Sequence, residues 1–162
     1  MTAQAKIDSM IGKEVVVSRL IDAPRERVFD AWIKPEQLAQ WWGPKGFVNA
    51  RCEIDPRPGG KIHIDMIRES DGKLFPLDGE VEEVDAPLRI VFRARGYNPA
   101  NHRTTIEDRV TATFTEERGK TLVTVRLFVL DVAPAFMEAA SRMEIGWSQS
   151  LQKLEGSTGS KE

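Results

Sequence analysis

Six segments between residues 47 and 130 alternate apolar and polar side chains, and this alternation constrains the fold more than any other feature of the chain. A period of two residues is typical of strands that bury one face and expose the other. The segments span residues 47–55, 61–67, 74–84, 88–96, 106–117 and 121–130. Because mostly short turns join them, the pattern predicts a meandering antiparallel sheet.

The same alternation predicts which side chains face the interior, because successive strand residues point to opposite faces. The expected inner face consists of Cys52, Ile54, Ile62, Ile64, Met66, Leu77, Val81, Ile90, Phe92, Val110, Ala112, Phe114, Val123, Val125 and Leu127. Cys52 is the single cysteine, which excludes a disulfide within the chain and a cysteine-based metal cluster. Its expected role is that of a small buried hydrophobe rather than a reactive thiol.

Helical patterns lie on both sides of this strand-rich region. Residues 14–22 are rich in β-branched side chains and predict a first strand, and residues 23–33 follow with apolar side chains at helical spacing. A second short helix is expected from Pro35 to Trp42, because a Gly-Pro dipeptide comes next and stops it.

The longest helix is expected near the C-terminus, from about Pro134 to Leu154. Its apolar stripe advances by three or four residues and consists of Phe136, Ala140, Met143, Trp147, Leu151 and Leu154. A sheet with one apolar face can bury that face and the stripe together if it curves around the helix. The predicted fold class is therefore α+β: a curved antiparallel sheet of about six or seven strands gripping a long C-terminal helix, with two short helices after the first strand.

The chain is long enough for one domain, which we expect at residues 14–155. Residues 1–13 are expected to be a flexible, irregular arm and residues 156–162 a disordered tail. The formal net charge of −2 and the scattered basic residues argue against a nucleic-acid partner. No secretory signal and no apolar run of about 18 residues is found, so we expect a cytoplasmic protein without a membrane partner.

Four motifs in order resemble one known superfamily. They are RLIDAPRERVFDAWIKPEQLAQWWGP, DPRPGGKIHIDM, DGEVEEVDAPLRIVF and GWSQSLQKLE. Together they are similar to the START-like or SRPBCC helix-grip superfamily, in particular to the branch homologous to the activator of heat-shock protein ATPase, over about residues 14–155. The superfamily includes lipid carriers, hormone receptors, cyclases, oxygenase domains and co-chaperones, so the resemblance specifies the fold more closely than the function. It also suggests a homodimer.

The helix-grip fold tends to leave an apolar cavity between sheet and helix, which we expect to be the binding site. The expected ligand-binding residues are Trp41, Trp42, Ile64, Met66, Leu77, Phe92, Phe114, Met137, Met143 and Trp147. Trp42 is predicted to be the more buried of the tryptophan pair. Trp41 is predicted to lie nearer the rim, where it could touch a ligand.

Candidates for catalysis are few. His63 lies opposite the apolar face and is expected to point to solvent, and His102 in the loop 97–105 is a weak catalytic candidate. The two histidines form no recognisable metal motif, and no phosphate-binding loop or nucleophile elbow occurs, so neither a metal nor a cofactor is expected. The carboxylates on the polar face are expected to form cross-strand charge pairs; they are Asp65, Glu80, Glu82 and Glu83.

Three functions remain open at this point. The first is a non-enzymatic protein that binds a small hydrophobic molecule in the cavity. The second is a cyclase-like or hydrolase-like enzyme that uses His102 or a buried carboxylate in the same cavity. The third is a co-chaperone that regulates a heat-shock ATPase, which the resemblance alone implies.

Overall fold

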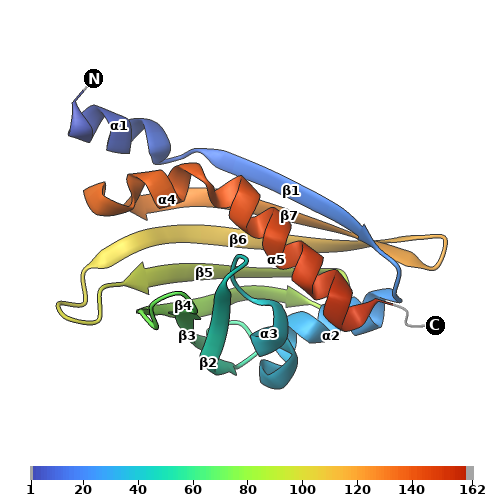
Figure 1. The fold of residues 1–162 in the computed structure, drawn as a ribbon. Coiled ribbons are helices and arrows are strands. Elements are labelled where there is room, and N and C mark those ends of the chain that lie inside the picture. The colour runs from blue at the N-terminus through green and yellow to red at the C-terminus, as the bar shows by residue number, and fades with distance from the viewer. Residues whose placement is uncertain (1, 160–162) are drawn as a thin grey trace.

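The structure is a computed structural model that describes residues 2–159 (Figure 1). Its elements follow the order α1 (Ala3–Met10), β1 (Glu14–Ile21), α2 (Arg25–Ile33), α3 (Pro35–Trp41), β2 (Phe47–Ile54), β3 (Lys61–Arg68), β4 (Leu74–Asp85), β5 (Arg89–Tyr97), β6 (Thr104–Glu117), β7 (Lys120–Val132), the 3-10 turn η1 (Pro134–Phe136), α4 (Met137–Ser141) and α5 (Met143–Thr158).

The seven strands form one antiparallel sheet in the order β1-β7-β6-β5-β4-β3-β2. Strands β2 to β7 follow one another as a meander, and β1 lies beside β7 at one edge. Figure 1 shows α5 crossing one face of the curved sheet, with α2 and α3 near its C-terminal end. The predicted helix-grip arrangement is therefore confirmed.

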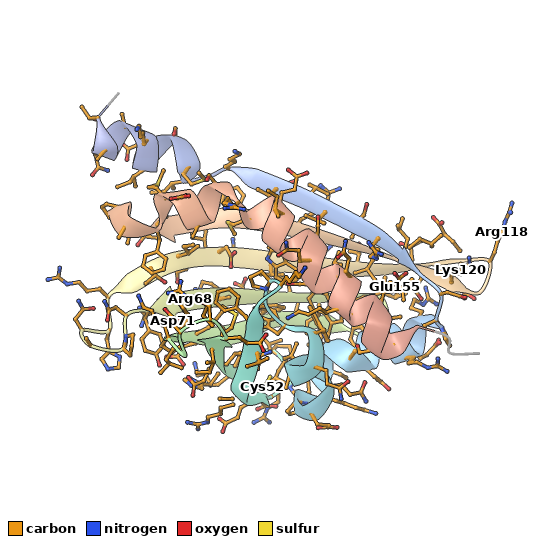
Figure 2. All side chains as sticks on the ribbon, in the orientation of Figure 1. Cys52, Arg68, Asp71, Arg118, Lys120 and Glu155 are labelled. Atoms are coloured by element: carbon orange, nitrogen blue, oxygen red, sulfur yellow. The ribbon has the colours of Figure 1, made fainter. Side chains whose placement is uncertain are left out.

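The main hydrophobic cluster lies between this face of the sheet and the helices. Every residue of the predicted inner face either belongs to this cluster or packs against it. The alternation along the strands thus identified the buried face correctly, because period-two patterning decides which side chains leave water. Cys52 is among the half-buried residues packed against the cluster, and Figure 2 shows it on β2. Burial raises the pKa of its thiol to about 11, which disfavours the reactive thiolate.

Aromatic rings occupy the centre of the main cluster. We call Trp32, Trp41, Trp42, Phe92, Phe114 and Trp147 the aromatic cluster. Trp32 stacks on Trp147 with ring centroids 5.9 Å apart and planes at 11°. Trp42 meets Trp147 edge-on at 5.2 Å and Phe92 at 5.9 Å. Such rings bury large apolar areas, so this cluster fixes α2, α3 and α5 against the sheet.

Two expectations about the ends of the chain are wrong. The region expected to be an irregular arm contains helix α1, whose Ile7 and Met10 are buried in a second hydrophobic cluster with residues of β7 and α4. The region expected to be a tail is helical as far as Thr158, and residues 160–162 lie outside the described residues. Short polar stretches with few large apolar side chains give too weak a period to predict such docking.

The C-terminal helix also differs from the prediction. Instead of one helix from about Pro134 to Leu154, the segment consists of η1, α4 and α5, with a break at Arg142. The backbone of Arg142 has φ −107° and ψ 14°, outside the helical region. Glu155 of α5 pairs with Arg19 of β1 at 2.8 Å and ties the far end of α5 to the edge strand (Figure 2).

Candidate functional site

Four of the predicted binding residues share one property: they face the interior, pack against the main cluster and are still partly exposed. We call Met66, Leu77, Met143 and Trp147 the inner-face strip. Met66 and Leu77 lie on β3 and β4, and Met143 and Trp147 lie in the first two turns of α5. The strip is therefore the part of the predicted lining that a molecule from solvent can reach.

The tryptophan pair is placed differently from the prediction. Trp41 is fully buried, and its Nε1–H donates a hydrogen bond to the carbonyl oxygen of Ala31 over 2.9 Å, whereas Trp42 keeps 7% of its surface exposed. Helix α3 ends at Trp41, and the backbone of Trp42 is extended. Helical spacing therefore does not apply to the pair, and both rings turn into the core. The expectation that Trp41 lies at the rim and that Trp42 is the more buried ring is wrong.

The remaining predicted binding residues are not brought to the strip. Ile64, Phe92 and Phe114 are between 1% and 3% exposed and belong to the packed core. Met137 lies in α4 and packs against the second cluster, beside α1. The prediction placed Met137 and Trp147 on one continuous helix, where both could line the same site. The break at Arg142 puts them on two different helices.

The loop after α3 borders the strip and is tied to α5. Gly43 has φ +96°, and a Cβ built there would lie 2.6 Å from the sulfur of Met66. The positive φ therefore favours glycine, and a side chain here would also displace the Met66 sulfur. The ammonium of Lys153 donates hydrogen bonds to the carbonyl oxygens of Pro44 at 3.3 Å and Phe47 at 3.2 Å. Partial burial lowers the pKa of Lys153, an effect that the nearby Glu69 opposes.

A charged pair lies beyond the strip on β3. Arg68, two residues after Met66, makes two hydrogen bonds to the carboxylate of Asp71, at 3.0 and 2.6 Å (Figure 2). These bonds, with a backbone N–H from Lys73, hold the pKa of Asp71 at about 2. The Arg68 guanidinium also lies 5.2 Å from the ring centroid of Phe75. On β3 the apolar strip is thus followed by a charged pair, Arg68 and Asp71, whose side chains are held in place by their hydrogen bonds.

One buried carboxyl group on the inner face was missed by the sequence reasoning. Asp108 is 8% exposed and pairs with Ala94 of β5 and Val129 of β7. Directly paired residues share a face, so Asp108 faces the interior as Ala94 does. The signal was present: the inner-face positions Val110, Ala112 and Phe114 extend back by two residues to Asp108.

The strand partners of Asp108 are both apolar, and no described residue supplies a counter-ion. Among the described residues, none donates a hydrogen bond to its carboxyl group or forms an ion pair with it. Burial, and then the like charge of Glu107, raise its pKa to about 7. A β-bulge in the pairing with β7 falls between Glu107 and Asp108, a feature that often redirects a side chain near a functional site.

The predicted open cavity is not confirmed by the packing. The aromatic cluster fills the centre between sheet and helix, and the two best-formed hollows of the described residues lie on the outer face. One, of about 240 Å³, is lined by Glu14, Arg109, Thr111, Arg126 and Phe128. The other, of about 400 Å³, is lined by Lys61, Ile62, His63, Asp78, Gly79, Glu80, Arg93, Arg95 and Glu107. Neither is bounded by a helix.

His63 faces the outer side, as predicted, but it is held by carboxylates rather than free in solvent. Its Nδ1 lies 2.7 Å from Asp78 and its Nε2 lies 2.8 Å from Asp65. Burial alone would lower the pKa of His63, but the hydrogen bonds to Asp78 and Asp65 outweigh it and the pKa is raised. A doubly protonated ring, which donates to both carboxylates, matches this geometry.

Other charges on this face pair across strands, as expected. Lys61 reaches Glu80 at 3.2 Å, and Arg109 reaches Glu82 at 2.7 Å. His102 is exposed in the turn between β5 and β6, where its ring stacks on Tyr97 with centroids 5.3 Å apart. These contacts give the outer-face groups and His102 structural roles away from the inner-face strip.

Residues 2–159 contain no group of three or more His, Cys, Asp or Glu side chains arranged to hold a metal ion. Within the same range, no helix is long and apolar enough to cross a membrane.

Comparison with known proteins gives one family match and many structural relatives. The family model for Activator of Hsp90 ATPase homolog 1-like proteins matches residues 22–158. A protein from Chromobacterium violaceum is 23% identical with a TM-score of 0.75, over 91% of this chain and 98% of the other. The AHSA1 protein from Silicibacter pomeroyi is 24% identical with a TM-score of 0.72, over 89% and 96%.

A protein from Arthrobacter aurescens, solved by NMR, is 19% identical with a TM-score of 0.78, over 90% of this chain and 86% of the other. At these identities the likeness concerns the fold. None of the curated proteins compared with the chain matches it.

Proposed function

The chain belongs to the Activator of Hsp90 ATPase homolog 1-like family, as the sequence motifs predicted, and we propose that it binds a small, largely apolar molecule on the inner-face strip. The observation that carries the proposal is the incomplete cover of four apolar side chains that pack directly on the core. Apolar surface left accessible on the inner side of a fold is typical of a ligand site.

The chemistry of the strip supports a small ligand. Met66 and Met143 are unbranched and polarizable, so they can adapt to molecules of different outline. Trp147 offers a flat ring on the helix side, and Leu77 an aliphatic surface on the sheet side. Because the other rings of the aromatic cluster fill the centre, the ligand is confined to the strip.

Displacement of an apolar fluorescent dye, together with native mass spectrometry of gently purified protein, tests this function. Leu77→Gln places a polar group on the strip, whereas Leu20→Gln makes the same change at a 43% exposed position outside it. We expect the first variant to bind the dye about tenfold more weakly, in line with the loss of one good apolar contact. The second should bind as the wild type does.

Equal dye binding by wild type and both variants, or none by the wild type, would remove the basis of the proposal. The native mass spectrum also reports the number of copies in the assembly, which tests the homodimer that the resemblance suggests.

An acid–base enzyme is the second candidate, and Asp108 is the observation that favours it. A carboxyl group with a pKa of about 7 on the inner face is poised to accept or release a proton near neutral pH. This function requires that the protein converts a bound compound into a product. Asp108→Asn should abolish that turnover and leave binding of the compound unchanged.

A regulator of a heat-shock ATPase is the third candidate, and it rests on the printed name of the matched family. Its test is the ATPase rate of a purified heat-shock protein of the Hsp90 class with and without this chain. An unchanged rate at saturating concentrations would dispose of it.

A further inference from the structure

We propose that Asp108 is the polar anchor of the ligand, which therefore carries a cationic amine beside its apolar body. This inference rests on the proposed binding function and specifies the class of ligand. It concerns a group that no described residue of the chain uses, and four observations support it.

The first observation is position. Asp108 pairs with Ala94, which belongs to the main cluster, and with Val129, which belongs to the second cluster. Met143, the first residue of α5, packs against both clusters. Asp108 on the sheet and Met143 on the helix are therefore both placed where the main cluster meets the second cluster. Met143 is also a member of the inner-face strip.

The second observation is the missing partner. A carboxyl group that is more than nine-tenths buried usually accepts hydrogen bonds or pairs with a cation, because its desolvation is costly otherwise. Asp108 is 8% exposed, and within residues 2–159 no N–H, O–H or basic group meets its oxygens, which keep a small accessible surface. A donor from outside the chain would satisfy it.

The third observation is the small size of the residues between Asp108 and Leu77 on β5. Its partner Ala94 has only a methyl group, and Gly96, two residues further along β5, pairs with Leu77 of the strip. A Cβ at Gly96 would lie 2.7 Å from Oγ1 of Thr105, so the Thr105 hydroxyl covers this position. Leu77 and Asp108 are two strands apart and offset by two residues along the strands, so they lie about 12 Å apart, a distance that one small molecule can span.

The fourth observation is a route for entry. The helix breaks at Arg142, directly before Met143, so the segment that carries Met143 is not one rigid helix. Met143 has a flexible side chain that can change rotamer without a strained conformation. A ligand that displaces this side chain reaches the carboxyl group from the strip.

Charge decides between an amine and a neutral donor. The carboxyl group of Asp108 has one charged neighbour that affects it, the like-charged Glu107, and both burial and this neighbour raise its pKa. An ammonium group supplies the opposite charge together with hydrogen-bond donors, whereas a hydroxyl supplies a donor alone. The ligand that gains most from this site is therefore cationic at one end.

Three probes with the same apolar chain test the inference: n-octylamine, n-octanol and n-octanoate, each titrated by calorimetry against the whole protein. We expect the amine to bind at least tenfold more tightly than the alcohol, and the octanoate most weakly. Asp108→Asn should weaken amine binding at least tenfold and leave alcohol binding within a factor of two.

Glu107→Gln is the matched control, because it removes one negative charge from the adjacent residue on the outer face, where Glu107 pairs with Arg93. It should leave the preference for the amine unchanged. A second variant, Asp108→Ser, guards against an effect peculiar to the amide. Circular dichroism and thermal unfolding report whether each variant is folded.

The outcomes separate this inference from the proposed function. If octanol and octylamine bind equally and Asp108→Asn changes neither, the strip binds apolar molecules but Asp108 is not its anchor. The same conclusion follows if Glu107→Gln weakens amine binding as much as Asp108→Asn does. If none of the three probes binds, the proposed function fails together with the inference.

Discussion

The indole N–H of Trp41 donates a hydrogen bond to the carbonyl oxygen of Ala31 across 2.9 Å, and this contact joins the end of α3 to α2. The ring of Trp41 also lies 4.6 Å from that of Trp32, centroid to centroid. Trp41 is therefore a structural residue, because its N–H has a hydrogen-bond acceptor and its ring packs within the core.

We predict that Trp41→Phe destabilises the protein more than Trp42→Phe. The first change leaves the Ala31 carbonyl without its donor and opens a void in a fully buried site, which costs about 2–4 kcal/mol. The second change affects a ring that is 7% exposed and should cost about 1–2 kcal/mol. Urea unfolding monitored by circular dichroism measures both; equal losses would show that the hydrogen bond contributes little.

Glycine at position 43 offers a second test of the loop that borders the strip. Gly43 and Gly46 have similar backbone angles, with φ +96° and φ +91°, but only a Cβ at Gly43 would meet Met66. Gly46→Ala should therefore lose only the backbone term, about 1 kcal/mol. Gly43→Ala should lose about 1–3 kcal/mol more, because the Met66 side chain must move as well.

Chemical denaturation of both glycine variants measures the difference. A loss at Gly43 no larger than that at Gly46 would mean that Met66 yields at no cost. That result would favour a strip that is loosely packed on its β3 side.

The pH dependence of stability should reveal Asp108. Its pKa is raised from 3.8 to about 7 in the folded state, so the folded protein holds a proton that the unfolded chain releases. Stability from this group is complete below about pH 4 and is lost as the pH rises to about 7. A pKa difference of about three units corresponds to about 4 kcal/mol.

Comparison with Asp108→Asn isolates this effect, because the amide has the same shape and does not titrate. We expect the variant to gain stability relative to the wild type as the pH rises from 4 to 8 in urea unfolding experiments. A constant difference between the two proteins over that range would show that Asp108 titrates normally in the folded state.

The sequence was most informative where one period extends over many residues. Strand alternation identified the inner face because each strand buries one side, and the family motifs agree with it. Prediction failed where an element ends: at Trp41–Trp42, where α3 stops between the two rings, and at Arg142, where a continuous stripe conceals a break. The spacing of apolar residues shows that a helix is present but does not show at which residue its backbone leaves the helical conformation.

Asp108 shows a different limit of the same reasoning. The alternation along β6 predicts that residue 108 faces inward. The inner face, however, was assigned from apolar residues alone, so a polar residue at an inward position was left out. Strand pairing with Ala94 and Val129 reveals it directly. A functional polar group on an apolar face is thus best sought at positions that the alternation predicts to face inward but that carry a polar residue.

The methionines provide the most direct test of the central claim that ligands bind on the inner-face strip. Met66 and Met143 lie on the strip, whereas Met10 and Met137 pack in the second cluster beside α1. The measurement is the shift of the methionine methyl signals in a carbon–proton NMR spectrum as n-octylamine is added. We predict that the Met66 and Met143 signals move with saturation while those of Met10 and Met137 stay in place. Movement of Met10 and Met137 alone, or of none of the four, would contradict the account.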